Sequence, residues 1–250
     1  MYKYIKRLKY TNYVHNKSFL ILLENKNINE NRGNFMISVI IPAYNEEKNI
    51  KTVIDICKEN KNVSEIIVVN NLSTDKTEEV AKRAGAKVIF CDKQGKGYAM
   101  EIGIREARNE CIVFLDGDIS DYADDVIYKL SEPILNRNVD FVKATFDRDG
   151  GRVTELVAKP MLNLLFPNVK KYTQPLSGMI AGKKSIFEKI ELEKDYGVDI
   201  GILLDMIKLN VSIEEVKIGK IQNVSKSWKA LEKMSTEVMK AILKRADIKC

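Results

Sequence analysis

Two carboxylates separated by one glycine are the residues of this 250-residue chain whose chemistry is easiest to interpret. Asp116-Gly117-Asp118 follows directly on the apolar run Cys111 to Leu115, which predicts a buried strand. Side chains two positions apart project to the same side of an extended chain, and the glycine leaves room for a ligand near the backbone. Paired carboxylates suit Mg²⁺ or Mn²⁺, which complete their shells with water and substrate phosphates. The substrate that this chemistry indicates is a diphosphate.

An isolated Asp-x-Asp is more often a polar turn or a helix cap than a metal site, so the surrounding sequence has to decide. A calcium loop of the EF-hand type begins in the same way. Its sixth position needs glycine and is Asp121 here, and its twelfth needs glutamate and is Ile127. The calcium-loop interpretation is therefore excluded.

A lysine between two glycines, Gly95-Lys96-Gly97, stands at the start of a predicted helix. Free N–H groups and the helix dipole favour phosphate at that position, and the lysine adds a full positive charge. The alternative is an ordinary solvated turn, and the Walker pattern Gly-x-x-x-x-Gly-Lys-Ser/Thr is not met. If the fold brings Lys96 beside the two aspartates, it is a candidate contact for the diphosphate.

Two later stretches carry further polar groups. Arg152 and the Thr154 hydroxyl lie near one predicted turn and helix start, which suits a phosphorylated or carboxylated acceptor. The alternative there is an exposed hairpin with ordinary surface charges. Asp199 lies beside small residues, where it binds sugar hydroxyls or caps a helix at 200–209.

The elements that must position these residues alternate between strand and helix in the first half of the chain. Strands are predicted at 37–41, 65–69, 87–90 and 111–115, with helices at about 46–59, between Asp75 and Gly85, and at 97–108. Strict alternation predicts an α/β fold with a mostly parallel, doubly wound sheet. After residue 125 the pattern weakens to a helix ending near 135, a strand at 140–145 and helical stretches near 152–165 and 228–246.

Ligands of such sheets bind beyond the carboxyl ends of the strands. The residues directly after the four strands are 42–46, 70–71, 91–97 and 116–118. We therefore expect these four segments to line one crevice.

Charge and cysteine content exclude several classes of function. The formal net charge is +6, but residues 1–35 hold seven Lys/Arg against Glu24 and Glu30, which leaves 34 basic and 33 acidic residues elsewhere. A near-neutral body gives little support to a nucleic-acid partner. The four cysteines form no Cys-x-x-Cys pair and three lie in apolar contexts, which favours a reducing cytoplasm.

The first 35 residues are expected to be a flexible leader or a mis-assigned start. The apolar stretch 19–23 is far shorter than the roughly 20 residues that cross a bilayer, so no integral membrane segment is expected. We expect residues 36–250 to form one domain, with a nucleotide-sugar-binding half at 36–125 and an acceptor-binding half at 126–250.

The ordered motifs resemble the nucleotide-sugar domain of GT-A glycosyltransferases, a Rossmann-like fold with C-terminal acceptor-binding helices. They are Val39–Glu47 (VIIPAYNEE), Asn70–Asp75 (NNLSTD), Gly95–Gly97 and Asp116–Asp118. The second half is similar to glucosyl-3-phosphoglycerate synthases in Gly150–Ala158 (GGRVTELVA), Gln174–Gly178 (QPLSG) and Tyr196–Gly201 (YGVDIG). This resemblance covers about residues 36–248.

The resemblance implies a role for each matching residue. In the donor site Pro42, Ala43, Tyr44 and Glu46 would hold the nucleoside with Asn71 nearby, and Leu176, Ser177, Tyr196 and Asp199 would surround the sugar. Lys96 would contact the diphosphate, Asp116 would face the ribose and the cation, and Asp118 would ligate Mg²⁺ or Mn²⁺. Arg152 and Thr154 would bind the acceptor phosphate.

The family retains the anomeric configuration, which implies attack from the face that the nucleoside diphosphate leaves and requires no side-chain base. Asp116, Asp118 and Lys96 would then act electrostatically. Two positions depart from the pattern. Asn223 stands where the family has a metal-binding histidine, since the only histidine is His15, and Asp199 replaces a glutamate often found there.

The resemblance predicts transfer of a sugar, glucose in the first instance, from a nucleoside diphosphate to 3-phosphoglycerate. Homodimers are frequent in the family, although no sequence feature identifies an interface. The alternatives are a polyprenyl-phosphate sugar synthase, which shares the first half, and a nucleotide-sugar-binding protein without turnover, prompted by Asn223. A sugar-1-phosphate nucleotidyltransferase is disfavoured because Pro42-Ala-Tyr, not a glycine-rich loop, follows the first strand.

Overall fold

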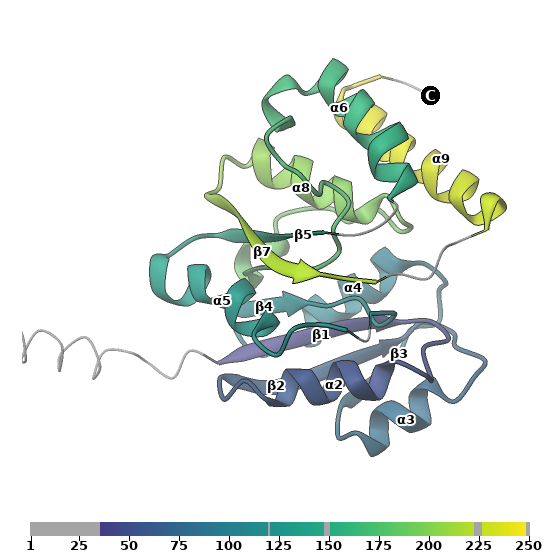
Figure 1. Ribbon diagram of the computed structural model, residues 1–250, viewed down its shortest axis with the longest axis vertical. Coiled ribbons are helices and arrows are strands. Elements are labelled where there is room, and N and C mark those ends of the chain that lie inside the picture. Colours follow the sequence, from purple (N-terminus) through teal and green to yellow (C-terminus); the bar gives the residue numbers. More distant parts are fainter. Residues whose placement is uncertain (1–35, 120, 148–150, 223–226, 249–250) are drawn as a thin grey trace, which may run out of the picture. The chain divides into compact units, whose positions relative to one another are not determined.

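A computed structural model describes residues 36–119, 121–147, 151–222 and 227–248. The expectations for residues 1–35 and for Asn223 lie outside these ranges. The described residues hold one seven-stranded sheet in the order β3-β2-β1-β4-β6-β5-β7 (Figure 1). Its strands are β1 (Ile37–Ala43), β2 (Val63–Asn70), β3 (Lys87–Phe90), β4 (Cys111–Phe114), β5 (Phe141–Asp147), β6 (Ile180–Lys183) and β7 (Ile213–Lys220).

Helices separate most of the strands. They are α2 (Ile50–Lys58), α3 (Thr77–Arg83), α4 (Lys96–Glu106), α5 (Val126–Arg137), α6 (Lys159–Leu165), α7 (Lys184–Phe187), α8 (Val198–Lys208) and α9 (Trp228–Arg245), with a π turn η1 (Thr154–Ala158) and a 3-10 turn η2 (Pro167–Val169). The predicted α/β class and mostly parallel sheet are confirmed. No helix of the described part of the chain has the length and apolar composition that crossing a membrane needs.

The second half of the sheet is less regular than the first, and its strands were harder to predict from the sequence. Strands β1 to β4 pair in parallel, whereas β6 lies antiparallel between β4 and β5, and β7 extends the sheet parallel to β5. Neither β6 nor β7 was predicted from the sequence. Strand β6 has only four residues, and β7 is a partly buried edge strand with charged residues, so both lack a strong apolar pattern.

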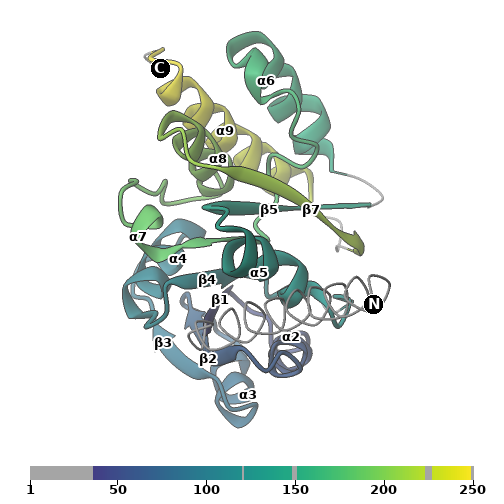
Figure 2. The same ribbon diagram turned by 90° about the vertical axis from the view of Figure 1, so that its left-hand side faces the viewer.

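The core lies on both faces of the sheet because alternate side chains of β1 point in opposite directions. Ile40 packs in one cluster with Met100 of α4, while Val39 and Ile41 pack in the other with residues of α2 and α5. Helices α6, α8 and α9 gather on the side of β5 and β7 (Figures 1 and 2). Helices on both faces leave the carboxyl ends of the parallel strands free to build a site.

Candidate active site

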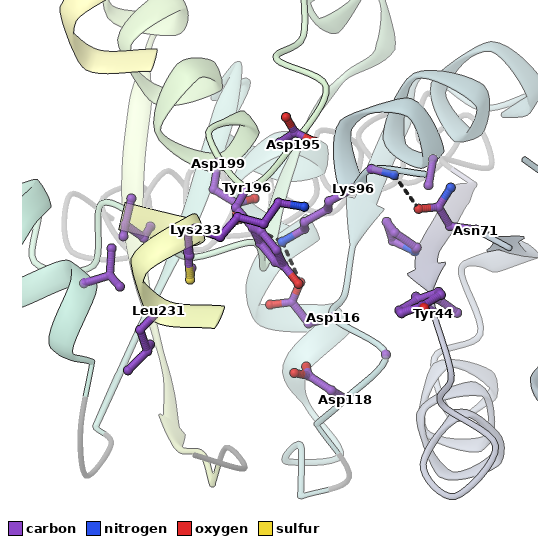
Figure 3. A pocket seen from close by; sticks show the side chains of 18 of the residues that line it. Tyr44, Asn71, Lys96, Asp116, Asp118, Asp195, Tyr196, Asp199, Leu231 and Lys233 are labelled. Carbon is purple, nitrogen blue, oxygen red and sulfur yellow. Dashed lines mark hydrogen bonds and ion pairs between the residues drawn. The ribbon is translucent and has the colours of Figure 1, made fainter. Parts of the chain in front are cut away.

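A cavity of about 720 Å³ opens at the carboxyl ends of β1, β2, β3 and β4 (Figure 3). Each of the four predicted crevice segments contributes to it, so that expectation is confirmed. They supply Pro42, Ala43, Tyr44, Glu46, Asn71, Gln94, Gly95, Lys96, Asp116, Gly117 and Asp118. The opposite wall comes from the second half of the chain and includes Arg152, Thr154, Leu176, Asp195, Tyr196, Asp199, Leu231, Lys233 and Met234.

The loop after β1 is fixed by side chains that precede and begin α3. The Glu46 N–H donates to the Thr77 hydroxyl at 2.7 Å, and the Glu47 N–H donates to Asp75 Oδ2 at 3.1 Å. Residues 47–49 form a turn, and α2 begins at Ile50 and not near residue 46 as predicted. Tyr44 is left 47% exposed on the rim of the cavity.

Asn71 joins the loops that follow β2 and β3. Its Nδ2 donates to the Lys93 carbonyl at 2.6 Å, and its Oδ1 accepts from the Gly95 N–H at 2.8 Å. Gly95 is the N-cap of α4 and has φ of 147°, a conformation that glycine adopts most readily. Asn71 therefore positions the start of α4 as well as lining the cavity.

Lys96, the first residue of α4, lies between two carboxylates. Its Nζ is 2.9 Å from Asp116 Oδ1 and 2.9 Å from Asp199 Oδ2 (Figure 3). The interpretation of Gly95-Lys96-Gly97 as a solvated turn is therefore wrong. Gly178 keeps this cluster compact, because a Cβ there would lie 2.2 Å from Lys96 Nζ and 2.6 Å from Asp116 Oδ1.

The ion pairs shift the pKa values of the cluster. Burial disfavours the charged form of Lys96, but the carboxylates of Asp116 and Asp199 outweigh it and raise the pKa of this ammonium. Burial raises the pKa of Asp199, and the charge of Lys96 opposes that rise. Asp199 is the second residue of α8, after the N-cap Gly197, so the alternative that it caps a helix is wrong.

One atom of this cluster lacks a partner. Asp199 Oδ1 is buried and accepts no hydrogen bond from any residue that the structure describes. An unsatisfied buried acceptor costs free energy comparable to a lost hydrogen bond. Because Asp199 lines the cavity, this oxygen can accept a hydrogen bond from a hydroxyl group of a ligand.

The turn that carries the two aspartates is held by a buried tyrosine. The Tyr122 hydroxyl accepts from the Asp116 N–H at 3.0 Å and donates to the Asp116 carbonyl at 3.1 Å. Asp116 and Asp118 both line the cavity and offer the hard oxygen donors that Mg²⁺ and Mn²⁺ take. The described residues hold no cluster of three or more His, Cys, Asp or Glu with metal-binding geometry. Two aspartates therefore suit a cation that a bound ligand helps to hold.

Arg152 also lines the cavity. No carboxylate of the described residues forms an ion pair with it, whereas its guanidinium carbon lies 4.9 Å from the centre of the Trp228 ring. Thr154, only 2% exposed, begins the π turn η1 two residues after Arg152. π-turns inside helices are frequent at functional sites. This part of the cavity is suited to an anion.

Ser177 differs from the other predicted site residues that the structure describes. It is 3% exposed and does not line the cavity. Its hydroxyl donates to the Met179 carbonyl at 3.3 Å, and its own carbonyl accepts from Lys143 Nζ at 2.8 Å. Ser177 thus lies behind Leu176, which does line the cavity.

Several cavity residues were not predicted from the sequence. They include Asp195, Leu231, Lys233 and Met234. The last three lie in the first turns of α9, where the apolar spacing of Leu231 and Met234 is equally typical of a core face. Lys233 is 3.7 Å from Glu237 and its side chain is 71% exposed, a pattern that predicts an ordinary surface pair.

The amino-acid sequence is similar to a known family and to several characterised enzymes. Residues 38–191 match the family model described as glycosyl transferase family 2. The chain is 33% identical over 238 residues to the glucosyl-3-phosphoglycerate synthase of Petrotoga mobilis, covering 84% of this chain and 73% of the relative. It is 31% identical over 173 residues to the dolichol-phosphate mannosyltransferase of Pyrococcus furiosus, covering 62% of this chain and 48% of that relative.

Solved structures agree with the sequence matches. A crystal structure of the Mycobacterium tuberculosis glucosyl-3-phosphoglycerate synthase, in complex with Mn²⁺, UDP-glucose and phosphoglyceric acid, superposes with a TM-score of 0.82 at 32% identity. It covers 86% of this chain and 81% of that one. A structure of the same protein with Mg²⁺ and UDP gives the same TM-score.

Proposed function

The chain belongs to glycosyl transferase family 2, and from this premise we propose that it transfers glucose from a nucleoside diphosphate to 3-phosphoglycerate with retention of the anomeric configuration. It is a glycosyltransferase with the GT-A fold. One observation supports the proposed reaction most directly. One cavity is lined by a pair of aspartates with Lys96 against Asp116, and also by Arg152, which forms no ion pair with a carboxylate of the described residues. Two separated anions, a donor diphosphate and an acceptor phosphate, match that distribution of charge.

For the donor, we assign Pro42, Ala43, Tyr44 and Glu46 to the nucleoside. Pro42 and Ala43 end β1, and Tyr44 and Glu46 belong to the loop after it, whose backbone is fixed by Thr77 and Asp75. A loop held in this way binds a ligand without first having to be ordered, which preserves affinity. Asn71 contributes chiefly by positioning Gly95.

Mg²⁺ or Mn²⁺ would be held by Asp118 and Asp116 together with the donor diphosphate. Both ions occur with UDP in solved structures of a relative. When bound, the ion neutralises negative charge on the diphosphate. Asn223, the third ligand that the sequence analysis proposed, lies outside the described residues.

For the sugar, we assign Leu176, Tyr196 and Asp199 to its surroundings, with Ser177 supporting the segment from behind. The unpaired Asp199 Oδ1 supplies an acceptor for a sugar hydroxyl. Lys96 already touches both Asp116 and Asp199, so it links the diphosphate end of the donor to the sugar end. Its positive charge would stabilise the negative charge that grows on the leaving diphosphate.

For the acceptor, Arg152 and Thr154 would bind the phosphate of 3-phosphoglycerate and hold its hydroxyl near the anomeric carbon. The rate gain would come from positioning and charge, since same-face attack needs no side-chain base.

As parts of the same proposal, residues 36–250 form one functional domain and the protein acts in the cytosol. There its buried free thiols Cys57, Cys91 and Cys111 stay reduced. We also propose that it forms a homodimer, as members of the family often do.

The test is a transfer assay. The purified protein is incubated with UDP-glucose or GDP-glucose, Mg²⁺ or Mn²⁺, and 3-phosphoglycerate, and the glucosylated acid is sought by mass spectrometry. Labelled sugar that partitions into organic solvent with a polyprenyl phosphate would instead support a lipid-phosphate sugar synthase, the class to which the Pyrococcus furiosus relative points. Calorimetric binding of a sugar nucleotide without product at any cation would indicate a binding protein.

A further inference from the structure

An exposed tryptophan lies against the guanidinium group of Arg152. Trp228 is 74% exposed, and its ring centre is 4.9 Å from Arg152 Cζ, within the range of a cation–π contact. It is the only tryptophan of the sequence. Single exposed apolar side chains are common on protein surfaces, so the contact with Arg152, and not the exposure of the ring, bears on function.

The two residues come from elements that are far apart in the sequence. Arg152 lies in the helical turn directly before η1, and Trp228 is the first residue of α9. Helices α6 and α9 lie side by side in both views (Figures 1 and 2), and η1 also contacts α9. The contact therefore joins Arg152, which lines the cavity, to the start of α9, where Trp228 itself does not line it.

No carboxylate in the described part of the chain forms an ion pair with the Arg152 guanidinium, although Lys96, which lines the same cavity, pairs with two. An arginine side chain that is free to rotate loses conformational entropy when a ligand fixes it. A ring face that already holds the guanidinium plane lowers that loss and leaves its N–H groups free for an anion.

Trp228 itself is well placed to serve as a fixed support. The Ser227 hydroxyl caps α9 by accepting from the Ala230 N–H at 3.3 Å. At the other end of α9, Arg245 binds Asp205 and Glu193, with its Nε at 2.8 Å from Asp205 Oδ1. Leu231, one turn after Trp228, lines the cavity, so the same face of α9 reaches both the site and Arg152.

We infer that Trp228 is a positioning residue for the acceptor site: its indole face orients the Arg152 guanidinium toward the phosphate of the acceptor. This inference rests on the proposed function, because it takes Arg152 as the acceptor contact. It predicts that Trp228 affects the acceptor and not the donor, although both bind in the same cavity.

Steady-state kinetics of Trp228→Ala and Trp228→Phe test the inference. Trp228→Ala is expected to raise KM for 3-phosphoglycerate roughly two- to fivefold, the range of an exposed cation–π contact, while KM for the sugar nucleotide stays unchanged. Trp228→Phe keeps a ring face and should recover part of the loss. The control is Leu164→Ala on α6, which removes an equally exposed apolar side chain, 83% exposed, that does not line the cavity. An unchanged acceptor KM in Trp228→Ala, or equal rises in both KM values, would overturn the inference.

A fluorescence titration separates this inference from the proposed function. Because Trp228 is the only tryptophan, its emission should change when 3-phosphoglycerate or inorganic phosphate binds, and Arg152→Met should abolish the change. A response to inorganic phosphate without a response to 3-phosphoglycerate, or without transfer, would reject the proposed acceptor and keep the role of Trp228. Unchanged emission with saturating phosphate would overturn the role of Trp228, whatever the transfer assay shows.

Discussion

The ammonium nitrogen of Lys96 lies 2.9 Å from Asp199 Oδ2, although 103 positions separate the two residues in the sequence. One residue starts α4 in the first half of the chain and the other lies in the first turn of α8 in the second half. Their ion pair therefore joins the two halves inside the cavity. Lys96 has the same distance to Asp116, so the diphosphate end and the sugar end of the proposed donor site share one cation.

Breaking this pair should destabilise the fold. Lys96→Met leaves the Asp199 carboxylate buried without its main counter-ion, and we expect the free energy of unfolding to fall by roughly 3 kcal/mol. The double variant Lys96→Met/Asp199→Asn should be more stable than Lys96→Met, because it leaves no buried unpaired carboxylate at position 199. Urea denaturation of the unmodified protein, of Lys96→Met, of Asp199→Asn and of the double variant measures the coupling.

The matched control is Lys87→Met, which breaks a surface pair with Glu106 and should change stability little. If the double variant is no more stable than Lys96→Met, the ion pair does not govern the stability of this region.

Removing one aspartate should abolish the effect of the cation. In Asp118→Ala, we expect transfer to fall roughly 10²- to 10³-fold, the several kcal/mol that a bound ion contributes to stabilising transition-state charge. The affinity for UDP in the presence of Mn²⁺, measured by calorimetry, should fall as well. Asp124→Ala removes an exposed aspartate that does not line the cavity and should keep both properties. Equal activity with and without a chelator in the unmodified protein would contradict a cation-assisted reaction.

Restoring the family's histidine should change the preferred ion. An imidazole is a better donor than an amide oxygen toward transition metals, so Asn223→His should increase the activity with Mn²⁺ more than the activity with Mg²⁺. The ratio of the two rates, measured at saturating substrates, is the readout. Asn223→Ala serves as the comparison, because it removes the amide without adding a ligand. An unchanged ratio in Asn223→His would show that residue 223 is not a ligand.

Lys143 should make the fold more stable at alkaline pH. It is fully buried, and burial lowers the pKa of its ammonium to about 8, below the usual 10.5. Between these values the unfolded chain binds more protons than the folded one, so the stability rises with pH, by at most about 1.4 kcal/mol per pH unit. Below pH 8 both states are protonated and the contribution no longer changes.

The measurement compares the free energy of unfolding of the unmodified protein and of Lys143→Met from pH 7 to pH 10.5. The difference between the two curves should slope only above about pH 8. A flat difference would mean that Lys143 has an ordinary pKa in the folded protein.

Much of the cavity could be predicted because the chemistry follows strong strands. Asp116 and Lys96 come at or near the ends of apolar runs, and parallel strands bring their carboxyl ends to one edge of the sheet. The order of four strands and the alternation with helices were enough to place Glu46 and Asn71 in the same cavity.

The second half was predicted mainly through its resemblance to known enzymes, since its own patterns are weaker. Strand β6 is too short to show a period, and the apolar residues of α9 look like core residues until tertiary contacts place Leu231 at the cavity. Lys233 and Trp228 carry no local signal at all. Their places depend on how α9 meets η1 and α8, which involves contacts between residues far apart in the sequence.

Asn71 shows how a whole loop can depend on the difference between nitrogen and oxygen. Its amide faces two neighbours of opposite character, an oxygen at Lys93 and an N–H at Gly95. An aspartate has the same shape but only oxygens, so it would keep the bond to Gly95 and set two oxygens against each other at Lys93. Hydrolysis of this single amide, a common form of chemical ageing in proteins, would misalign the start of α4 while every carboxylate and lysine of the site remained intact. Asn71 is only 5% exposed, and this burial therefore limits the access of water to the amide as well as contributing to packing.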